Sequence, residues 1–299
     1  MPKICYRPKK FNADRLDKIA KANAIIVEYR NQGFELTLRQ LYYQFVSRDF
    51  IPNNQREYKN LGDIINDARL AGLVDWEAIV DRTRNLQALA NWESPSDIIR
   101  ACANQYRIDK WENQQYRVEC WIEKDALVGV IEGVCNDLDI DYFSCRGYTS
   151  QSEMWSAAMR LKKYRQNAQV PLVLHLGDHD PSGKDMTRDI TDRLTEFSGD
   201  DVEVKRLALN MDQVNQYNPP PNPAKITDSR AEGYIEEFGA ESWELDALEP
   251  AVIAQLIRDA VLEVRDEDEW EKAVAEEAKQ KEQLGKVSAK WNTIIEELE

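Results

Sequence analysis

The chain lacks several features that mark whole classes of protein. No apolar run approaches the ~20 residues that span a bilayer, and the opening "MPKICYRPKK" is not followed by an apolar stretch. We therefore expect neither a signal peptide nor a membrane anchor. The five cysteines are scattered and form no C-x-x-C pair, which argues against a disulfide framework and a thiolate zinc site. These absences predict a cytoplasmic protein.

Histidine is scarce and positive charge is in deficit. The two histidines, His175 and His179, have no cysteine or third histidine beside them, so we expect packed or surface roles rather than a zinc site. The net charge of -15 repels a phosphate backbone. Charge is segregated, however: residues 1–34 carry eight basic side chains against three acidic ones, and residues 262–299 carry six against twelve. Any DNA-binding surface must therefore be local, and the acidic end reads as a solvated helix face.

What is present indicates a folded protein of about two domains. The 299 residues are 42% hydrophobic and 31% charged, with eight Trp and twelve Tyr. This composition is typical of globular rather than disordered chains, and the length suffices for two ordinary cores.

The first 70 residues predict three short helices. Residues 12–32 read as an amphipathic helix, "NQGFE" as a turn, and Thr37 as the N-cap of a second helix. The third, "NNQREYKNLGDIINDARLAG", has one apolar face and ends at Gly72. The residues of that face are Leu61, Ile64, Ile65 and Ala68. Such a set suggests a helix-turn-helix or winged-helix module, a type that often binds DNA. The likeliest break follows at "ESPSD", residues 93–97.

From Arg117 the pattern alternates between strand and helix. "YRVECWIEK" reads as a strand with Val118, Cys120 and Ile122 inward, and "VPLVLHLGDHD" as a strand buried on both faces. The other expected elements, in order, are helix "DALVGVIEGVCNDL", strand "DYFSCRGYTS", helix "SQSEMWSAAMRLKKYRQ", a helix from about Lys184 to Phe197, and strand "VEVKRLAL". This alternation predicts an α/β fold with a mostly parallel sheet. "NPPPNPAK", residues 218–225, is expected to be a loop.

Three acids stand at the ends of two of these strands. Glu123 closes the first strand, and Asp178 and Asp180 close the long apolar one. If the strands are parallel neighbours, the three carboxylates converge at one edge of the sheet. Hard oxygen ligands in such a cluster suit Mg²⁺. A D-x-D pair alone is weak, because aspartates are common in turns.

The stretch "TLRQLYYQF" holds two adjacent tyrosines on the second helix. At about 100° per residue, Tyr42 falls within the apolar stripe and Tyr43 outside it. Arg39 is the i−4 neighbour of Tyr43. We therefore predict that Tyr42 is in the core and that Tyr43 points outward beside a guanidinium. One reading of Tyr43 is a surface ring covering the arginine stem; the other is a nucleophile beside a cation that stabilises a transition state.

These segments resemble a known family. "WIEKDAL" and "HLGDHDPSGKDM" are similar to the two signature pieces of a Toprim domain, and "LRQLYY" resembles the R-x-x-[FY]-Y element of a winged-helix domain. Both occur, in this order, in the topoisomerase VI A subunit and its relative that makes meiotic double-strand breaks. The resemblance covers roughly residues 30–250, and the chain is most like the compact, stand-alone Mini-A type of plasmids and phages.

The resemblance implies a domain plan and partners. Residues 1–110 would form the winged-helix domain, 111–250 a Rossmann-like Toprim domain, and 251–299 a charged helical segment packed on the Toprim domain or on a dimer partner. The partners would be double-stranded DNA and a second copy of the chain, with active sites shared between subunits. No ATP site is expected in this chain, so ATP-driven strand passage would need a separate ATPase B-like subunit.

The resemblance also assigns residue roles. Tyr43 would be the nucleophile, Arg39 would stabilise the developing charge, and Glu123, Asp178 and Asp180 would hold Mg²⁺, with two ion sites allowed. Lys124 and Asp185 would have supporting roles.

The implied activity is that of a type II topoisomerase-like enzyme. It would cleave both DNA strands by transesterification and leave 5′-phosphotyrosyl links. Three alternatives remain: a Toprim nuclease that uses metal-activated water, a catalytically silent DNA-binding protein, and a phosphatase with its nucleophile in the D-x-D pair.

Overall fold

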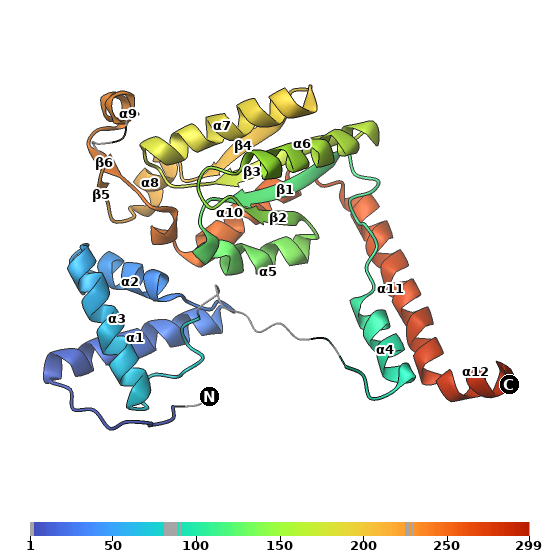
Figure 1. Cartoon of the computed structure of the whole chain (residues 1–299), viewed down its shortest axis with the longest axis horizontal. Coiled ribbons are helices and arrows are strands. Elements are labelled where there is room, and N and C mark those ends of the chain that lie inside the picture. Colours follow the sequence, from blue (N-terminus) through green and yellow to red (C-terminus); the bar gives the residue numbers. More distant parts are fainter. Residues whose placement is uncertain (1–2, 81–88, 90, 225–227, 229, 299) are drawn as a thin grey trace.

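The computed structural model describes residues 3–80, 89, 91–224, 228 and 230–298 (Figure 1). Lys225, the end of the expected proline-rich loop, lies outside these residues, as do both ends of the chain. Within the described part, no helix is both long and apolar enough to cross a membrane. All five cysteines are free.

The N-terminal region contains three helices, as expected: α1 (Ala13–Asn31), α2 (Leu38–Ser47) and α3 (Gln55–Leu70). Each begins at a residue whose side-chain oxygen accepts a backbone N–H of the first turn, namely Asn12, Thr37 and Asn54. Thr37 forms a full capping box with Gln40. The predicted apolar face of α3 is buried in a core shared by the three helices. The helix prediction is confirmed here.

A winged-helix domain, the class predicted for this region, also contains a small β-sheet called the wing. Across residues 3–80 the strand-like pairings are single bridges, Leu36 with Ile79 and Cys5 with Ala71. The three helices are therefore observed, whereas the winged-helix class stays a prediction.

A parallel four-stranded sheet forms the second region. Its strands are β1 (Tyr116–Ile122), β2 (Asp141–Ser144), β3 (Val170–Leu176) and β4 (Glu203–Ala208), in the order β2-β1-β3-β4. All three neighbouring pairs are parallel. The chain is therefore an α/β protein with a parallel sheet, as the alternating pattern predicted.

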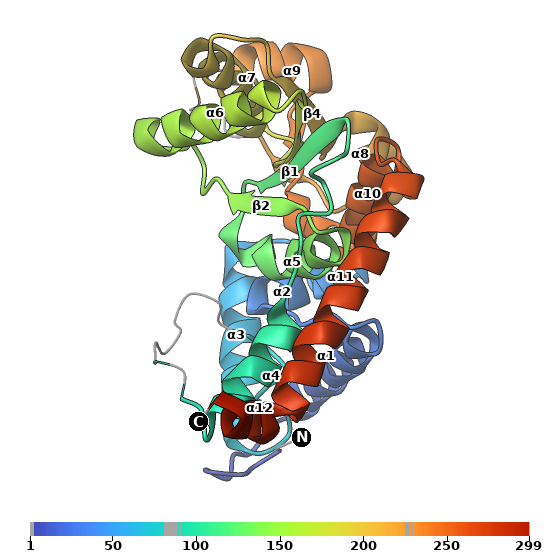
Figure 2. The same ribbon diagram turned by 90° about the vertical axis from the view of Figure 1, so that its right-hand side faces the viewer.

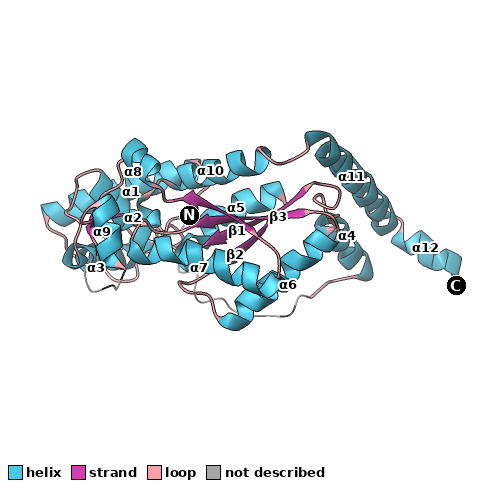
Figure 3. Ribbon diagram, turned by 90° about the horizontal axis from the view of Figure 1, so that it is seen from above, coloured by secondary structure: helices cyan, strands magenta, loops and turns pink. Residues whose placement is uncertain are grey.

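Helices cover both faces of this sheet (Figure 3). On one face, α5 (Val128–Leu138) and α10 (Pro250–Leu262) pack over Val118, Cys120 and Ile122. On the other face, α6 (Gln151–Gln166) and α7 (Pro181–Ser198) pack over Trp121. The three predicted inward residues of β1 are buried, but the strand is buried on its second face too. The two helical layers explain this, because a parallel sheet needs crossover helices on its faces.

Short elements continue from β4 around the carboxyl ends of the strands (Figure 1). They are α8 (Met211–Tyr217), β5 (Asn222–Pro223), α9 (Ala231–Phe238), β6 (Glu241–Ser242) and the 3₁₀ turn η2 (Leu245–Ala247); a second 3₁₀ turn, η1 (Asp125–Leu127), follows β1. The proline-rich loop thus contains a two-residue strand, which pairs antiparallel with β6. Proline is tolerated there because the pair is isolated from the main sheet.

Helices α4 (Pro95–Gln105), α11 (Glu267–Ala289) and α12 (Trp291–Leu298) form an arm that extends from the sheet (Figures 1 and 2). Ser96 donates a hydrogen bond to the backbone oxygen of Ser288 at 3.0 Å. Midway along α11, Glu277 accepts the backbone N–H of Ile108 at 3.1 Å and pairs with Lys110 at 2.8 Å. The acidic helix α11 is therefore held against α4 and the segment after it by specific contacts.

A buried carboxylate fixes α6 on the sheet. Glu119, on β1, is 1% exposed and accepts two hydrogen bonds from Arg160 at 2.7 and 2.8 Å. It also accepts the indole N–H of Trp121 at 2.9 Å. These contacts satisfy a charge that could not otherwise remain in the core.

We predict that Arg160→Met destabilises the protein by about 2–3 kcal/mol, because it leaves the Glu119 charge buried without its cation. The double variant Glu119→Gln, Arg160→Met should lose less, since it removes the charge as well. Urea unfolding of the two variants and the wild type measures both values. Equal losses in the single and double variants would contradict this account.

Candidate functional site

The carboxyl ends of β1 and β3 lie side by side, as predicted. Ile122 aligns with Leu176, so Glu123 and Gly177 follow at the same level. Glu123 Oε2 accepts the backbone N–H of Asp178 at 2.9 Å. A Cβ on Gly177 would lie 2.9 Å from that oxygen, so a side chain at this position would displace the carboxylate from where it lies. Two of the three predicted acids are therefore together.

Asp178 is the most enclosed of the three acids, at 8% exposure. Its Oδ1 accepts the backbone N–H of Leu245 at 2.7 Å and lies 3.0 Å from Lys124 Nζ. This aspartate therefore connects the end of β3 to the turn η2, far along the chain.

Asp180 has a structural task as the N-cap of α7. Its Oδ1 accepts the backbone N–H of Gly183 at 2.6 Å and the hydroxyl of Ser182 at 2.9 Å. The helix therefore begins at Pro181, and the prediction of a start near Lys184 was wrong. Proline fits the first helical position because its missing N–H would be unsatisfied there anyway.

Burial and nearby acids disfavour the charged forms of both carboxylates. Burial, together with the charge of Asp178, raises the pKa of Glu123 to about 7. Burial raises the pKa of Asp178 to about 6, with Lys124 opposing the rise and Asp246 adding to it. Crowded, partly desolvated carboxylates are a setting that a divalent cation would relieve.

The oxygen-rich edge therefore fits Mg²⁺ in donor type. Among the described residues, however, no three His, Cys, Asp or Glu side chains are arranged to hold a metal ion. The ligand set Glu123, Asp178 and Asp180 stays a prediction.

Two acids that the sequence analysis missed complete this edge. Lys124 Nζ lies 2.7 Å from Glu244 Oε2 and 3.0 Å from Asp246 Oδ1. Arg39, on α2, donates from Nε to Asp246 at 2.7 Å and from Nη2 to Glu244. We call these five side chains, Arg39, Lys124, Asp178, Glu244 and Asp246, the ionic junction. It connects the N-terminal helices to the sheet edge.

No local signal in "SWELDALEP" points to α2, about 200 residues earlier. The E-x-D spacing of Glu244 and Asp246 could have marked them as candidate ligands, but not their partners. Other contacts support the same junction: Tyr29 donates a hydrogen bond to Glu249, and Ala247 is buried in the N-terminal core.

Tyr43 is not exposed, and the prediction that it points outward was wrong. It is 4% exposed and its ring lies 5.7 Å from the Arg39 guanidinium carbon. The prediction from helical angles treated α2 as an isolated helix, whereas in the structure η2 packs against α2. Burial, Asp246 and Glu244 raise the pKa of the Tyr43 phenol, and Arg39 and Lys124 oppose that rise.

Tyr42 is buried, as predicted. Its hydroxyl donates to Asn53 Oδ1 at 3.0 Å or to the backbone oxygen of Asn54 at 3.1 Å. The pairing of Tyr43 with Arg39 on one flank is also confirmed, although that flank lies at the junction rather than in solvent.

Asp185, a predicted supporting acid, belongs to another cluster. It pairs with Arg188 at 2.7 Å and with Arg230 at 2.8 Å, and it accepts the hydroxyl of Tyr148. Its carboxylate therefore has cationic partners of its own.

Both histidines are packed, one of the two roles expected. His175 Nδ1 is 2.9 Å from the Thr187 hydroxyl, and His179 Nδ1 is 2.7 Å from the Tyr234 hydroxyl. Burial lowers the pKa of His175 to about 3 and that of His179 to about 4. The neutral rings suit a packing role.

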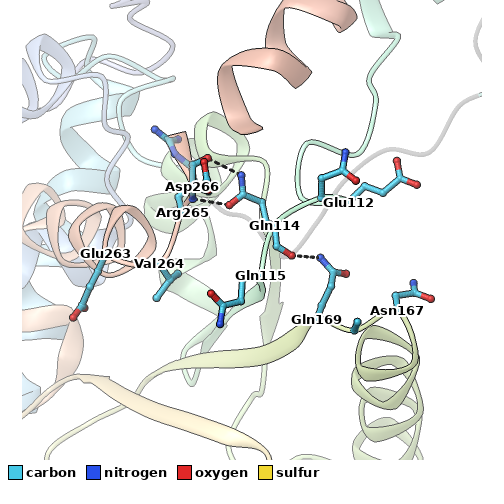
Figure 4. Close-up of a pocket in the computed structure, with 11 residues that line it drawn as sticks. Glu112, Gln114, Gln115, Asn167, Gln169, Glu263, Val264, Arg265 and Asp266 are labelled. Carbon is cyan, nitrogen blue, oxygen red and sulfur yellow. Dashed lines mark hydrogen bonds between the residues drawn. The ribbon is translucent and has the colours of Figure 1, made fainter. Parts of the chain in front are cut away.

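Two cavities lie at opposite edges of the sheet. The larger, about 590 Å³, is at the amino ends of the strands (Figure 4). There the side-chain amide of Gln114 donates to the backbone oxygen of Asp266 and accepts its backbone N–H, and Gln169 donates to backbone oxygens. These hydrogen bonds connect neighbouring segments of the chain, which indicates a structural role for the two glutamines. The smaller, about 390 Å³, borders the ionic junction and is lined by Arg39 and Tyr43. It is therefore the cavity associated with the candidate site.

No family model, curated protein or solved structure matches this chain.

The ionic junction predicts a pH dependence of stability. Burial alone would raise the pKa of Glu244, but Lys124 and Arg39 lower it from 4.5 to about 2. Its contribution should be full above pH 4.5 and should be lost as the pH falls towards 2. Glu244→Gln should therefore lose less unfolding free energy than the wild type between pH 5 and pH 3. Urea unfolding at both pH values measures this, and equal losses in the two proteins would count against it.

Proposed function

We propose that the chain is a Mg²⁺-dependent enzyme that cleaves double-stranded DNA by tyrosine transesterification. The proposal includes the finer fold classes, a winged-helix domain followed by a Toprim domain. The observation that carries it is the ionic junction, which brings Arg39 and Tyr43 to the edge where Glu123 and Asp178 meet. Ion pairs and hydrogen bonds thus connect the helix that carries Tyr43 to the sheet edge that carries the acids.

Tyr43 would attack the scissile phosphorus through its phenolic oxygen. A bond from this oxygen to phosphorus forms, the bond to the 3′-oxygen breaks, and the product is a 5′-phosphotyrosyl link with a free 3′-hydroxyl. Burial keeps the phenol protonated, so ionisation must depend on the neighbouring cations, Arg39 and Lys124, which oppose the rise of its pKa.

Arg39 would stabilise the charge that develops on the phosphate. Two of its nitrogens are engaged by carboxylates, and its side chain is 43% exposed. Nη1 has no hydrogen bond within the described part of the chain and can donate to a phosphate oxygen. Glu244 and Asp246 would hold the guanidinium in place.

When bound at Glu123, Asp178 and Asp180, Mg²⁺ would supply charge neutralisation at the phosphate and at the leaving oxygen. Contacts within the chain hold two of these acids in place. The Glu123 carboxylate accepts the backbone N–H of Asp178, and the Asp178 carboxylate accepts the backbone N–H of Leu245 and pairs with Lys124. The raised pKa values of the two acids support a site that gains from a cation.

A homodimer and a separate ATPase partner belong to the same proposal. They rest on the family resemblance. The contacts of Arg39 and Lys124 join Tyr43 to the acid edge of its own chain, so the proposal places each active site within one chain, in place of the sharing between subunits that the resemblance implies. DNA would contact a local surface, because the chain as a whole is acidic.

We predict that Tyr43→Phe abolishes covalent protein–DNA adducts on plasmid DNA with Mg²⁺, because the variant lacks the attacking oxygen. Arg39→Gln should lower adduct formation by about 10²-fold, the scale of losing one transition-state donor. Denaturant trapping followed by gel analysis measures both. Tyr6→Phe, an exposed tyrosine at 64%, is the control and should form adducts at the wild-type level.

Other results of this experiment would separate the alternatives. If Tyr43→Phe still cuts DNA at a near wild-type rate with no adduct, metal-dependent hydrolysis is the better account. If the wild type binds DNA but never cuts it, the chain is a silent DNA-binding protein.

We further predict that EDTA abolishes cleavage and that Glu123→Gln and Asp178→Asn each reduce it by at least about 10²-fold while DNA binding is retained. Asp192→Asn, an exposed acid on α7, serves as the matched control. Mg²⁺ titration by calorimetry should show weaker binding in the first two variants only. Unchanged Mg²⁺ affinity in both would rule out this ligand assignment.

A further inference from the structure

The cavity beside the ionic junction has a distinctive lining. Its volume is about 390 Å³, and Tyr42, Tyr43 and Tyr58 are among the residues that line it. The Tyr42 ring makes edge contacts with both others, at centroid distances of 5.4 and 5.3 Å. Amide side chains from two segments, Asn53 and Asn222, also line it. The charged residues of the lining are Arg39 and its partner Glu244, and the remaining ones are Asn54, Gln55 and Pro223.

The cavity is held in shape by hydrogen bonds between its walls. Asn53 Nδ2 donates to Asn222 Oδ1 at 2.7 Å and to the backbone oxygen of Pro221 at 3.2 Å. Asn53 Oδ1 accepts the hydroxyl of Tyr42. The backbone of Asn222 is fixed by pairing with Ser242. This preorganisation lowers the entropy cost of binding a ligand.

One amide nitrogen remains available for recognition. Asn222 Nδ2 has no hydrogen bond to any residue that the structure describes, and Asn222 lines the cavity. An amide can pair with the edge of a nucleobase, as asparagine does with adenine. Tyr42 and Tyr43 are each 4% exposed, so the partly buried ring of Tyr58 is the one that offers stacking surface to a base. The lining therefore suits a nucleobase, with the phosphate beside Arg39.

The size of the cavity limits the form of the DNA. A volume of about 390 Å³ is at the low end of the ~300–1,000 Å³ range of small-ligand pockets. A paired base, stacked on both sides within a duplex, cannot enter such a space. A nucleotide that has left the stack can enter it, as in enzymes that extrude a base.

From these observations we propose that the cavity binds one unpaired nucleotide next to the scissile phosphate. The preferred substrate is then DNA with an extruded or unpaired nucleotide, rather than a uniformly paired duplex. The choice of DNA as the polymer rests on the proposed function, whereas the fit of a nucleobase rests on the cavity itself.

Binding of a fluorescent base tests this proposal. The full chain, in EDTA to prevent cleavage, is titrated into three probes: a matched duplex containing 2-aminopurine, the same duplex with 2-aminopurine as a single unpaired bulge, and the free 2-aminopurine deoxynucleotide. We expect the bulged DNA to bind at least tenfold more tightly than the matched duplex, with quenched fluorescence from stacking. The free nucleotide should bind more weakly than the bulged DNA.

Substitutions inside and outside the cavity test where the unpaired nucleotide binds. Tyr58→Leu and Asn222→Ala should each reduce the preference for the bulge by about tenfold. The same loss in Asn222→Ala would show that the effect of Tyr58→Leu does not come from a folding defect. Tyr217→Leu, a tyrosine 37% exposed outside the cavity, should behave as the wild type. Equal binding of matched and bulged DNA, or a preference unchanged in both cavity variants, would overturn the proposal. Free nucleotide binding as tight as bulged DNA would also overturn it.

The same probes separate this inference from the proposed function. With Mg²⁺ present, adducts that form equally on matched and bulged DNA would sink the inference and leave the transesterase intact. Quenched, variant-sensitive binding of bulged DNA without any adduct would support the cavity assignment and count against the transesterase.

Discussion

The arrangement of the molecule depends on opposite charges that meet between distant parts of the chain. Arg39 from α2 and Lys124 from the end of β1 both bind Glu244 and Asp246, and Lys124 continues to Asp178. Partly buried charges of this kind are tolerated only when they are paired and hydrogen-bonded. Because each carboxylate serves two cations, the junction positions the N-terminal helices and the sheet edge at once.

This constraint explains the character of the candidate site. The same turn that supplies Glu244 and Asp246 donates the Leu245 N–H to Asp178, so one short segment orders both α2 and the acid edge. Tyr43 lies in this setting with its phenol buried, beside the cavity that Arg39 borders. In the proposed function, a phosphate would contact Nη1 of Arg39 while Glu244 and Asp246 hold the other two nitrogens of the guanidinium.

Much of the fold and part of the site could be predicted from sequence, for physical reasons that are local. Thr37 as an N-cap, the α3 face and the convergence of Glu123 with Asp178 follow from capping, periodicity and the geometry of parallel strands. The burial of Tyr43 and the roles of Glu244 and Asp246 depend on a contact across about 200 residues, which no local pattern encodes. The start of α7 at Pro181 was missed because Asp180 was read only as a ligand and not as a cap.

The central claim is that Arg39 is energetically coupled to the sheet edge within this chain. A double-mutant cycle of Arg39→Ala and Asp246→Ala, measured by urea unfolding at pH 7, tests it most directly. We predict a coupling free energy of at least about 1 kcal/mol, since the two side chains are in direct contact. Effects that add within ~0.3–0.5 kcal/mol, the behaviour of independent sites, would contradict the account.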